Sequence, residues 1–149
     1  MTRFFSLFSI IFVLFALPAQ AASAPVTELN IVSGSTTHRF SVEVAITPKQ
    51  QEKGLMFRTE MAADHGMLFV MREEVPMQMW MKNTALSLDM LFIDRYGEIR
   101  YIAHSTTPYS TDLIRYEEPV RAVLELLGGT SQSLNIQVGD RVMHPSFTP

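Results

Sequence analysis

Charged and amide side chains interrupt an otherwise apolar stretch, MWMKNTALSLDMLFID, at residues 79–94. Lys82, Asn83 and Asp89 lie there among Leu, Met, Phe and Trp residues. Because a buried charge is stable only with a partner, these side chains either line a polar pocket or satisfy one another. If the segment NTALS joins two neighbouring strands as a hairpin loop, Lys82 and Asp89 lie close together. The spacing therefore predicts a polar cluster near the mouth of a sheet.

Ionisable residues on two other segments are candidates for the same cluster. Arg58 follows an apolar segment expected to pack into the core, and Glu125 interrupts the apolar run VLELL at 123–127. A pocket made by these groups suits a small polar or anionic ligand. The candidate pocket residues are Arg58, Trp80, Lys82, Asn83, Asp89 and Glu125. In the alternative interpretation, Asp89 accepts hydrogen bonds from Lys82 or Arg58 and the network is structural.

Residue types that mark common catalytic sites are scarce in this chain. It contains no Cys, no Gly-flanked serine elbow of the type G-x-S-x-G and no Gly-rich phosphate loop. A hydrolase that uses Asp89 or Glu125 as general base is an alternative, but carboxylate chemistry depends on separations that a sequence does not give. We therefore expect a binding or accessory module without a cofactor, rather than an enzyme.

Methionines beside Trp80 allow one kind of metal site. On a strand, Met77, Met79 and Met81 share one face. Thioethers suit Cu(I), and a neighbouring indole adds a cation–π contact. In the alternative interpretation these side chains fill irregular gaps in a core, as Met often does. The four histidines show no pair at ligand spacing.

Short β-rich segments are expected to position these residues. In the segment 38–47, apolar and polar residues alternate with period two, which is typical of a half-buried strand. One short helix is predicted from the cap Thr47 to the stop Gly54, and 130–136 is expected to contain one helical turn. The predicted strands are 28–34, 38–47, 66–71, 77–82, 86–93, 99–104, 122–127 and 138–144. Between them we expect a polar connection at 72–76, a hairpin turn in DRYGEI (94–99) and an irregular stretch at 106–119. This pattern indicates a mostly β (α+β) domain, a compact, antiparallel, barrel-like sheet of seven or eight strands.

The first residues have the three parts of a secretory signal peptide. In Met1–Ala21, Arg3 precedes an apolar run of about fourteen residues, and a small-x-small cleavage pattern ends the segment. The run is too short to span a bilayer, which takes about twenty residues. We expect cleavage after Ala21, with Ala24 as the alternative, no stable membrane anchor afterwards, and a periplasmic or secreted bacterial protein. Residues 22–27 are then a loose arm and 28–149 a single globular domain.

The net charge of the chain indicates which classes of binding partner to expect. The formal net charge is −3, and no Lys/Arg cluster occurs. A mildly acidic domain of this kind is unsuited to nucleic acid or to anionic lipid. A small ligand is the expected partner, and the sequence identifies no protein partner.

Six sequence blocks follow one another in a distinctive order. They are KGLMFR (53–58), GMLFVM (66–71), WMKNT (80–84), LDMLFID (88–94), VLEL (123–126) and GDRV (139–142). Together they resemble the family called domain of unknown function 192, and they cover essentially the whole chain after the leader. The resemblance implies a small β-rich, barrel-like fold, frequent secretion signals among bacterial and archaeal members, and no established activity. Two positions depart from the family pattern: Met79 replaces an aromatic residue before Trp80, and Ser87 replaces a Pro.

Overall fold

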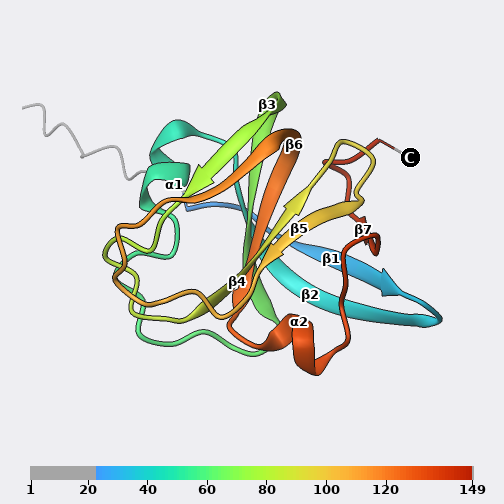
Figure 1. The fold of residues 1–149 in the computed structure, drawn as a ribbon, viewed down its shortest axis with the longest axis horizontal. Helices are drawn as coiled ribbons and strands as arrows, with labels where there is room; N and C mark the ends of the chain where they lie inside the picture. Colours follow the sequence, from blue (N-terminus) through green and yellow to red (C-terminus); the bar gives the residue numbers. More distant parts are fainter. Residues whose placement is uncertain (1–22, 149) are drawn as a thin grey trace, which may run out of the picture.

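One curved mixed sheet dominates the computed structural model, which describes residues 23–148 (Figure 1). The elements are β1 (Val26–Ser33), β2 (Thr36–Ala45), α1 (Pro48–Lys53), β3 (His65–Met79), β4 (Leu88–Ile93), β5 (Ile99–Ala103), β6 (Ile114–Leu127), α2 (Thr130–Ser133) and β7 (Arg141–Met143). The expected leader Met1–Ala21 lies outside the described residues. β1 begins at Val26, so the last two residues of the predicted loose arm belong to the sheet. No helix within 23–148 is long and apolar enough to cross a membrane.

The strands follow the order β5-β4-β6-β3-β2-β1-β7 and form a half-barrel. Its two edges approach each other at one end, where the Ile99 N–H donates to the Asp140 carbonyl (3.0 Å) and the Val142 N–H donates to the Gly97 carbonyl (2.7 Å). The mostly β, barrel-like prediction is confirmed. The sheet is not entirely antiparallel, however, because β2 and β3 run parallel. The chain returns from the end of β2 to the start of β3 through α1 and the segment 54–64, which allows this direction.

The helix α1 forms as its capping residues predict. The Thr47 side chain accepts a hydrogen bond from the Gln50 N–H (3.3 Å), and the Gln50 side chain accepts one from the Thr47 N–H (3.0 Å). Gly54 ends the helix with a φ of 47°, a conformation that favours glycine. The second helix, α2, is the predicted turn within 130–136.

The long strand β3 differs from the prediction. We expected separate strands at 66–71 and 77–82 with a polar connection between them. β3 instead continues through that connection, with register shifts at Val70, Val75 and Met77, because β6 pairs with it along its length. The first half of β6 lies in a stretch that the sequence suggested was irregular. The charged residues fit this two-stranded ribbon because many of them are exposed to solvent.

The predicted hairpin between β3 and β4 is wrong. β6 lies between these two strands, and it pairs with both of them. The connecting segment passes the end of β6, where the Gly128 N–H donates to the Ser87 carbonyl (2.8 Å). A Cβ at Gly128 would lie 2.5 Å from Ser87 Oγ, so a larger residue would have to displace the Ser87 hydroxyl. This inserted strand separates the residues that we expected to meet.

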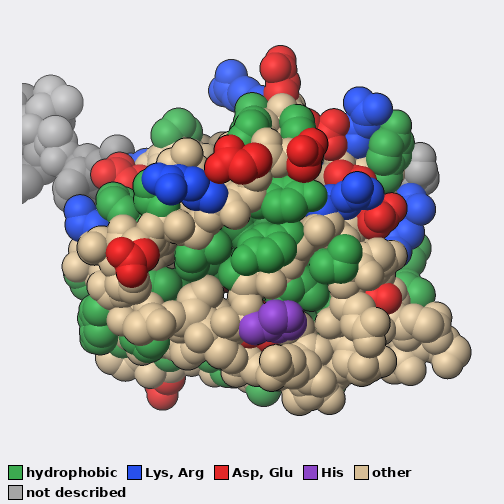
Figure 2. Space-filling model, in the orientation of Figure 1, with side chains coloured by type: hydrophobic (Ala, Val, Ile, Leu, Met, Phe, Trp, Pro, Cys, Tyr) green, Lys and Arg blue, Asp and Glu red, His purple; other side chains and the backbone are tan. Residues whose placement is uncertain are grey.

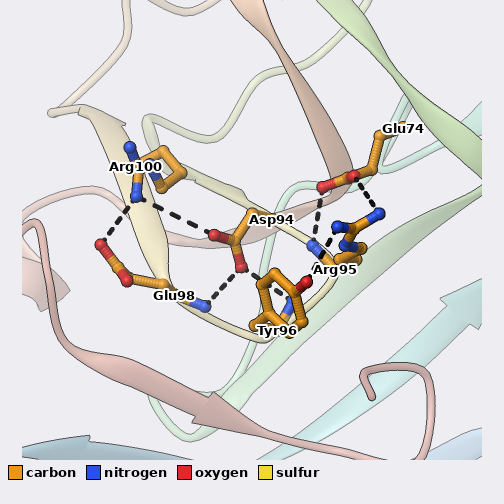
Figure 3. Close-up of polar contacts among 6 residues, drawn as sticks. All are labelled: Glu74, Asp94, Arg95, Tyr96, Glu98 and Arg100. Carbon is orange, nitrogen blue, oxygen red and sulfur yellow. Dashed lines mark hydrogen bonds and ion pairs between the residues drawn. The ribbon is translucent and has the colours of Figure 1, made fainter. Parts of the chain in front are cut away.

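The hairpin between β4 and β5 does form as predicted. In its turn the Asp94 carboxylate accepts hydrogen bonds from the Tyr96 N–H (2.9 Å) and the Glu98 N–H (3.0 Å), as Figure 3 shows. Glu74 accepts a hydrogen bond from the Arg95 N–H (3.0 Å), which connects this turn to β3 (Figure 3). Asp94 therefore has a local structural role.

Alternating side chains place two hydrophobic cores on the two faces of the sheet. On β6, Leu124 and Leu126 face the interior of the half-barrel, whereas Val123 and Glu125 face the other side. Part of this second core is an aromatic group in which Tyr101 and Tyr116 stack at 5.6 Å. Figure 2 shows hydrophobic side chains gathered in the middle of one face of the molecule, with charged residues along its upper border.

Candidate functional site

Asp89 lies fully buried on β4, on the interior face of the sheet. Its Oδ1 accepts hydrogen bonds from the Ser105 N–H (2.7 Å) and the Gly129 N–H (3.0 Å). Its Oδ2 accepts from the Ser131 N–H (2.8 Å) and the Ser131 hydroxyl (2.6 Å). Neither Lys82 nor Arg58 is among these partners. Asp89 therefore links β4 to α2 and to the segment after β5, as a structural network does.

Four donors stabilise the ionised form of Asp89. Burial alone raises the pKa of this carboxyl, but the hydrogen bonds from Ser131, Ser105 and Gly129 outweigh it and hold the pKa below its ordinary value. An ionised carboxylate whose oxygens are already occupied is a poor general base. This geometry disfavours the hydrolase alternative that used Asp89.

A histidine extends the Asp89 network to the surface. The Ser131 hydroxyl has one proton and donates it to Asp89, so its oxygen accepts from Nδ1 of His104 at 2.9 Å. The proton of neutral His104 is therefore on Nδ1. His104 and Ser131 border a hollow of about 420 Å³ between β5 and α2. No residue spacing indicates this arrangement, because the residues come from three separate segments.

Arg58 forms a bidentate ion pair away from Asp89 and Glu125. Its guanidinium donates to the two carboxylate oxygens of Glu43 at 2.5 and 2.8 Å. These hydrogen bonds are the main reason that the pKa of Glu43 lies below its ordinary value, although partial burial opposes them. Glu43 did not figure among the predicted site residues, since it stands on the polar face of a regular strand.

Lys82 and Asn83 are exposed. The Lys82 ammonium lies 4.9 Å from the centre of the Trp80 ring. Asn83 has a φ of 55° and its carbonyl accepts a hydrogen bond from the Phe57 N–H (2.8 Å), and Phe57 also has a positive φ. The KGLMFR and WMKNT blocks thus meet at the surface, and the predicted contact between Lys82 and Asp89 is absent.

A pocket of about 210 Å³ lies between α1, β3 and β6. In Figure 1 the C-terminal end of β3 lies next to α1, and both contribute to its wall. Residues 51–56, Phe69, Met71, residues 77–80 and Thr84 surround Glu125 in this pocket. Of the six predicted site residues, the pocket therefore contains two, Trp80 and Glu125.

Glu125 is a buried carboxyl group at this pocket. It is 4% exposed, and its neighbours across the sheet are Met67 and Met90. Burial raises its pKa to about 8, and no hydrogen bond or charge from residues 23–148 contributes to that shift. At neutral pH the carboxyl is therefore mostly protonated and available as a hydrogen-bond donor.

The two buried carboxyl groups cannot act as a pair. Asp89 lies opposite Leu126 in the register, and Glu125 lies opposite Met90. Successive residues of a strand face opposite sides, so Asp89 and Glu125 are on different faces of the sheet. A mechanism that uses both carboxylates on one substrate is excluded by this arrangement.

The predicted methionine stripe is divided in the structure. Met77 and Met79 line the Glu125 pocket together with Met56 and Met71, and all four are half-buried. Met81 is fully buried instead, because β3 ends at Met79, and its sulfur accepts a hydrogen bond from the Thr106 hydroxyl (3.1 Å). Within 23–148, no group of three or more His, Cys, Asp or Glu side chains is arranged for a metal ion.

Comparisons with known proteins agree with the resemblance of the sequence blocks. A model of the DUF192 family, described as "Uncharacterized ACR", matches residues 30–144. The chain is 44% identical to a Sinorhizobium meliloti 1021 protein whose crystal structure is described as that of a "putative transcription regulator". That match covers 86% of this chain and 100% of the other, with a TM-score of 0.83.

A second crystal structure, of a protein of unknown function from Novosphingobium aromaticivorans DSM 12444, is 34% identical. It covers 83% of this chain and 94% of the other, with a TM-score of 0.78. No curated protein matches the chain. The family match covers most of the chain and confirms the resemblance; the chain belongs to the DUF192 family.

Proposed function

We propose that this protein is an exported binding module whose ligand enters the pocket at Glu125. The observation that carries this proposal is a buried carboxyl group, without a partner among residues 23–148, that lines a pocket. Among residues 23–148, the one fully enclosed side-chain nitrogen or oxygen without a hydrogen-bond partner is His38 Nε2, so the Glu125 carboxyl is not fully enclosed and opens onto the pocket. Such a group is a candidate for function because a ligand can supply the missing partner.

The composition of the wall supports a binding role. Four of the six blocks that resemble the family contribute residues to the pocket: KGLMFR, GMLFVM, WMKNT and VLEL. Methionines and Trp80 make up much of the wall, Glu125 is its buried ionisable group, and Glu52 and Lys53 of α1 are its exposed ones. This combination is typical of small-ligand sites, where few polar groups fix the orientation.

The charges that suggested an anionic ligand lie elsewhere. Arg58 is engaged by Glu43, and Lys82 lies over Trp80. The ligand that we propose is therefore small and either presents a hydrogen-bond acceptor to neutral Glu125 or, as a cation, replaces its proton. The leader-like Met1–Ala21 supports export.

The acidic net charge argues against nucleic acid as the partner, whatever the role of the Sinorhizobium meliloti protein. A gel-shift assay with random-sequence duplex DNA at 150 mM salt tests this part of the proposal. We expect no shift at micromolar protein.

The single tryptophan provides the assay for binding. Trp80 lines the pocket, so its fluorescence reports on the site without interference from another indole. The experiment screens fragments of up to about fifteen heavy atoms and soft and hard metal ions against the purified protein, by fluorescence and thermal shift. We expect ligands that bind with 1:1 stoichiometry and lose at least tenfold in affinity in Glu125→Gln.

The matched control is Glu118→Gln, an exposed carboxylate on the same strand, β6, that does not line the pocket. It should leave the affinity within threefold of the wild type. Ligands that bind Glu125→Gln and the wild type equally, in a variant with an unchanged circular dichroism spectrum, would overturn the proposal.

A further inference from the structure

Seven of the ten methionines of this protein fall into two structural groups. Met67, Met81 and Met90 are fully buried in the second core, where packing explains them. Met56, Met71, Met77 and Met79 are half-buried and gather around the Glu125 pocket, although they come from the segment after α1 and from both halves of β3. Met71, Met77 and Met79 also pack against the second core. Leu or Ile could fill that role, so packing alone does not require thioethers at four positions around one small cavity.

We propose that the ligand of this pocket is Cu(I), held by thioether sulfurs of these four methionines and by the carboxylate of Glu125. The inference rests on the proposed function, namely that the pocket binds a ligand at Glu125. Thioethers are soft donors that select Cu(I) over hard cations. A methionine side chain has three rotatable bonds, so its sulfur adjusts to an arriving ion with little change in the backbone.

The other donors in the pocket favour the same ion. Zn²⁺ sites take several Cys, His or carboxylate ligands, and Mg²⁺ and Ca²⁺ sites take several oxygens. No His lines this pocket, the chain has no Cys, and Glu125 is the buried carboxyl of the wall. The other carboxylate of the wall, Glu52, is exposed. One buried carboxylate among thioethers provides too few hard ligands for those divalent ions.

Glu125 gives the binding step a defined proton balance. The neutral carboxyl loses its O–H proton to solvent, its oxygen then contacts Cu(I), and the oxidation state of the metal is unchanged. One proton is released for each ion bound.

Three other charged side chains lie at or near the pocket. Glu52 and Lys53 of α1 contribute opposite charges to its wall. The Lys82 ammonium lies over the Trp80 ring and thus occupies a cation-binding surface of the indole. Trp80 is therefore the spectroscopic reporter of the site, and the thioethers and Glu125 are the ligands.

The experiment titrates Cu(I) anaerobically into the purified protein against bicinchoninate, a chromophoric Cu(I) competitor. Trp80 fluorescence and proton release at pH 6.5 are followed together, and Ag(I) serves as a redox-inert repeat. We expect one Cu(I) per protein, a saturable change in Trp80 fluorescence and about one proton released. Met77→Leu/Met79→Leu should lower the affinity at least 100-fold, and Glu125→Gln should abolish the proton release.

Met143→Leu is the matched control, because Met143 is exposed and lies on β7, outside the pocket. It should leave the affinity unchanged, and circular dichroism should establish that every variant is folded. Equal Cu(I) affinity in Met77→Leu/Met79→Leu and the wild type, or no binding above micromolar affinity, would overturn the Cu(I) inference. If fragments from the screen still depend on Glu125, the binding proposal stands without Cu(I); if no ligand depends on it, both fail.

Discussion

Relative to the wild type, Glu125→Gln should gain free energy of unfolding as the pH rises from acidic to slightly alkaline values. Burial raises the pKa of Glu125 in the folded protein to about 8, from an ordinary value of 4.5. Between these values the folded state holds a proton that the unfolded state has released. The free energy of unfolding of the wild type therefore falls as pH rises through this window, by up to about 1.4 kcal/mol per pH unit.

The size of the effect is large compared with the stability of a small domain. From pH 5 to pH 7.5 the difference between the variant and the wild type should grow by about 3 kcal/mol in favour of the variant. Typical domains unfold with about 5–15 kcal/mol in total. Glutamine has nearly the same shape as the protonated carboxyl and does not ionise, so it removes the pH dependence with little change in packing.

Urea denaturation at pH 5, 6 and 7.5, followed by circular dichroism and Trp80 fluorescence, measures this difference. Other titrating groups are common to both proteins and cancel. Glu52→Gln, at an exposed position of α1, should change stability by less than about 0.5 kcal/mol at each pH. A Glu125→Gln difference that stays constant between pH 5 and 7.5 would refute the reasoning, because it would mean that Glu125 ionises normally in the fold.

Three further substitutions test the polar networks of Asp89, His104 and Glu43. Asp89→Ala leaves four donors without an acceptor and should lower the free energy of unfolding in urea by about 3–5 kcal/mol; a loss below 1 kcal/mol contradicts this. Because its folded pKa is depressed, the contribution of Asp89 is present above about pH 4 and should disappear as the pH falls through that folded pKa. Ser131→Ala should shift the proton of neutral His104 partly from Nδ1 to Nε2 in ¹⁵N NMR spectra, and an unchanged tautomer would mean that the serine does not fix it. Glu43→Gln weakens the partly exposed pair with Arg58 and should cost about 1 kcal/mol, with a smaller difference in 1 M salt.

Local sequence signals predicted the local structure well. The Thr47 cap, Gln50 and the Gly54 stop fixed α1, and the DRYG turn gave the β4–β5 hairpin. These features depend on residues a few positions apart, so the chain encodes them directly. The family resemblance was also confirmed, because its blocks are distinctive and occur in order.

Long-range pairing was the part that the sequence did not determine. We paired β3 with β4 because they are consecutive, but β6, which follows them in the chain, pairs with both strands and separates them. The same insertion moved Asp89 away from Lys82 and gave it donors from Ser105, Gly129 and Ser131. No spacing within the sequence indicates which remote backbone amides will surround a carboxylate.

Only part of the candidate site was predicted, because long-range strand pairing decides which of its residues meet. Trp80 and Glu125 line one pocket, while Arg58, Lys82 and Asp89 lie in other surroundings. Met77 and Met79 share a face because they are two residues apart on a strand. Met56 and Met71 join them only through the tertiary fold. The role of these residues in binding, like export, stays a prediction.

The most direct test of the account is the pKa of Glu125, measured by ¹³C NMR of its side-chain carboxyl in the ligand-free protein between pH 4 and 9. We predict a midpoint near 8 because the carboxyl is buried without a partner at the base of the pocket. A midpoint near 4.5 would contradict the account, since it would show that the carboxyl is hydrated or paired and has no proton to exchange for a ligand.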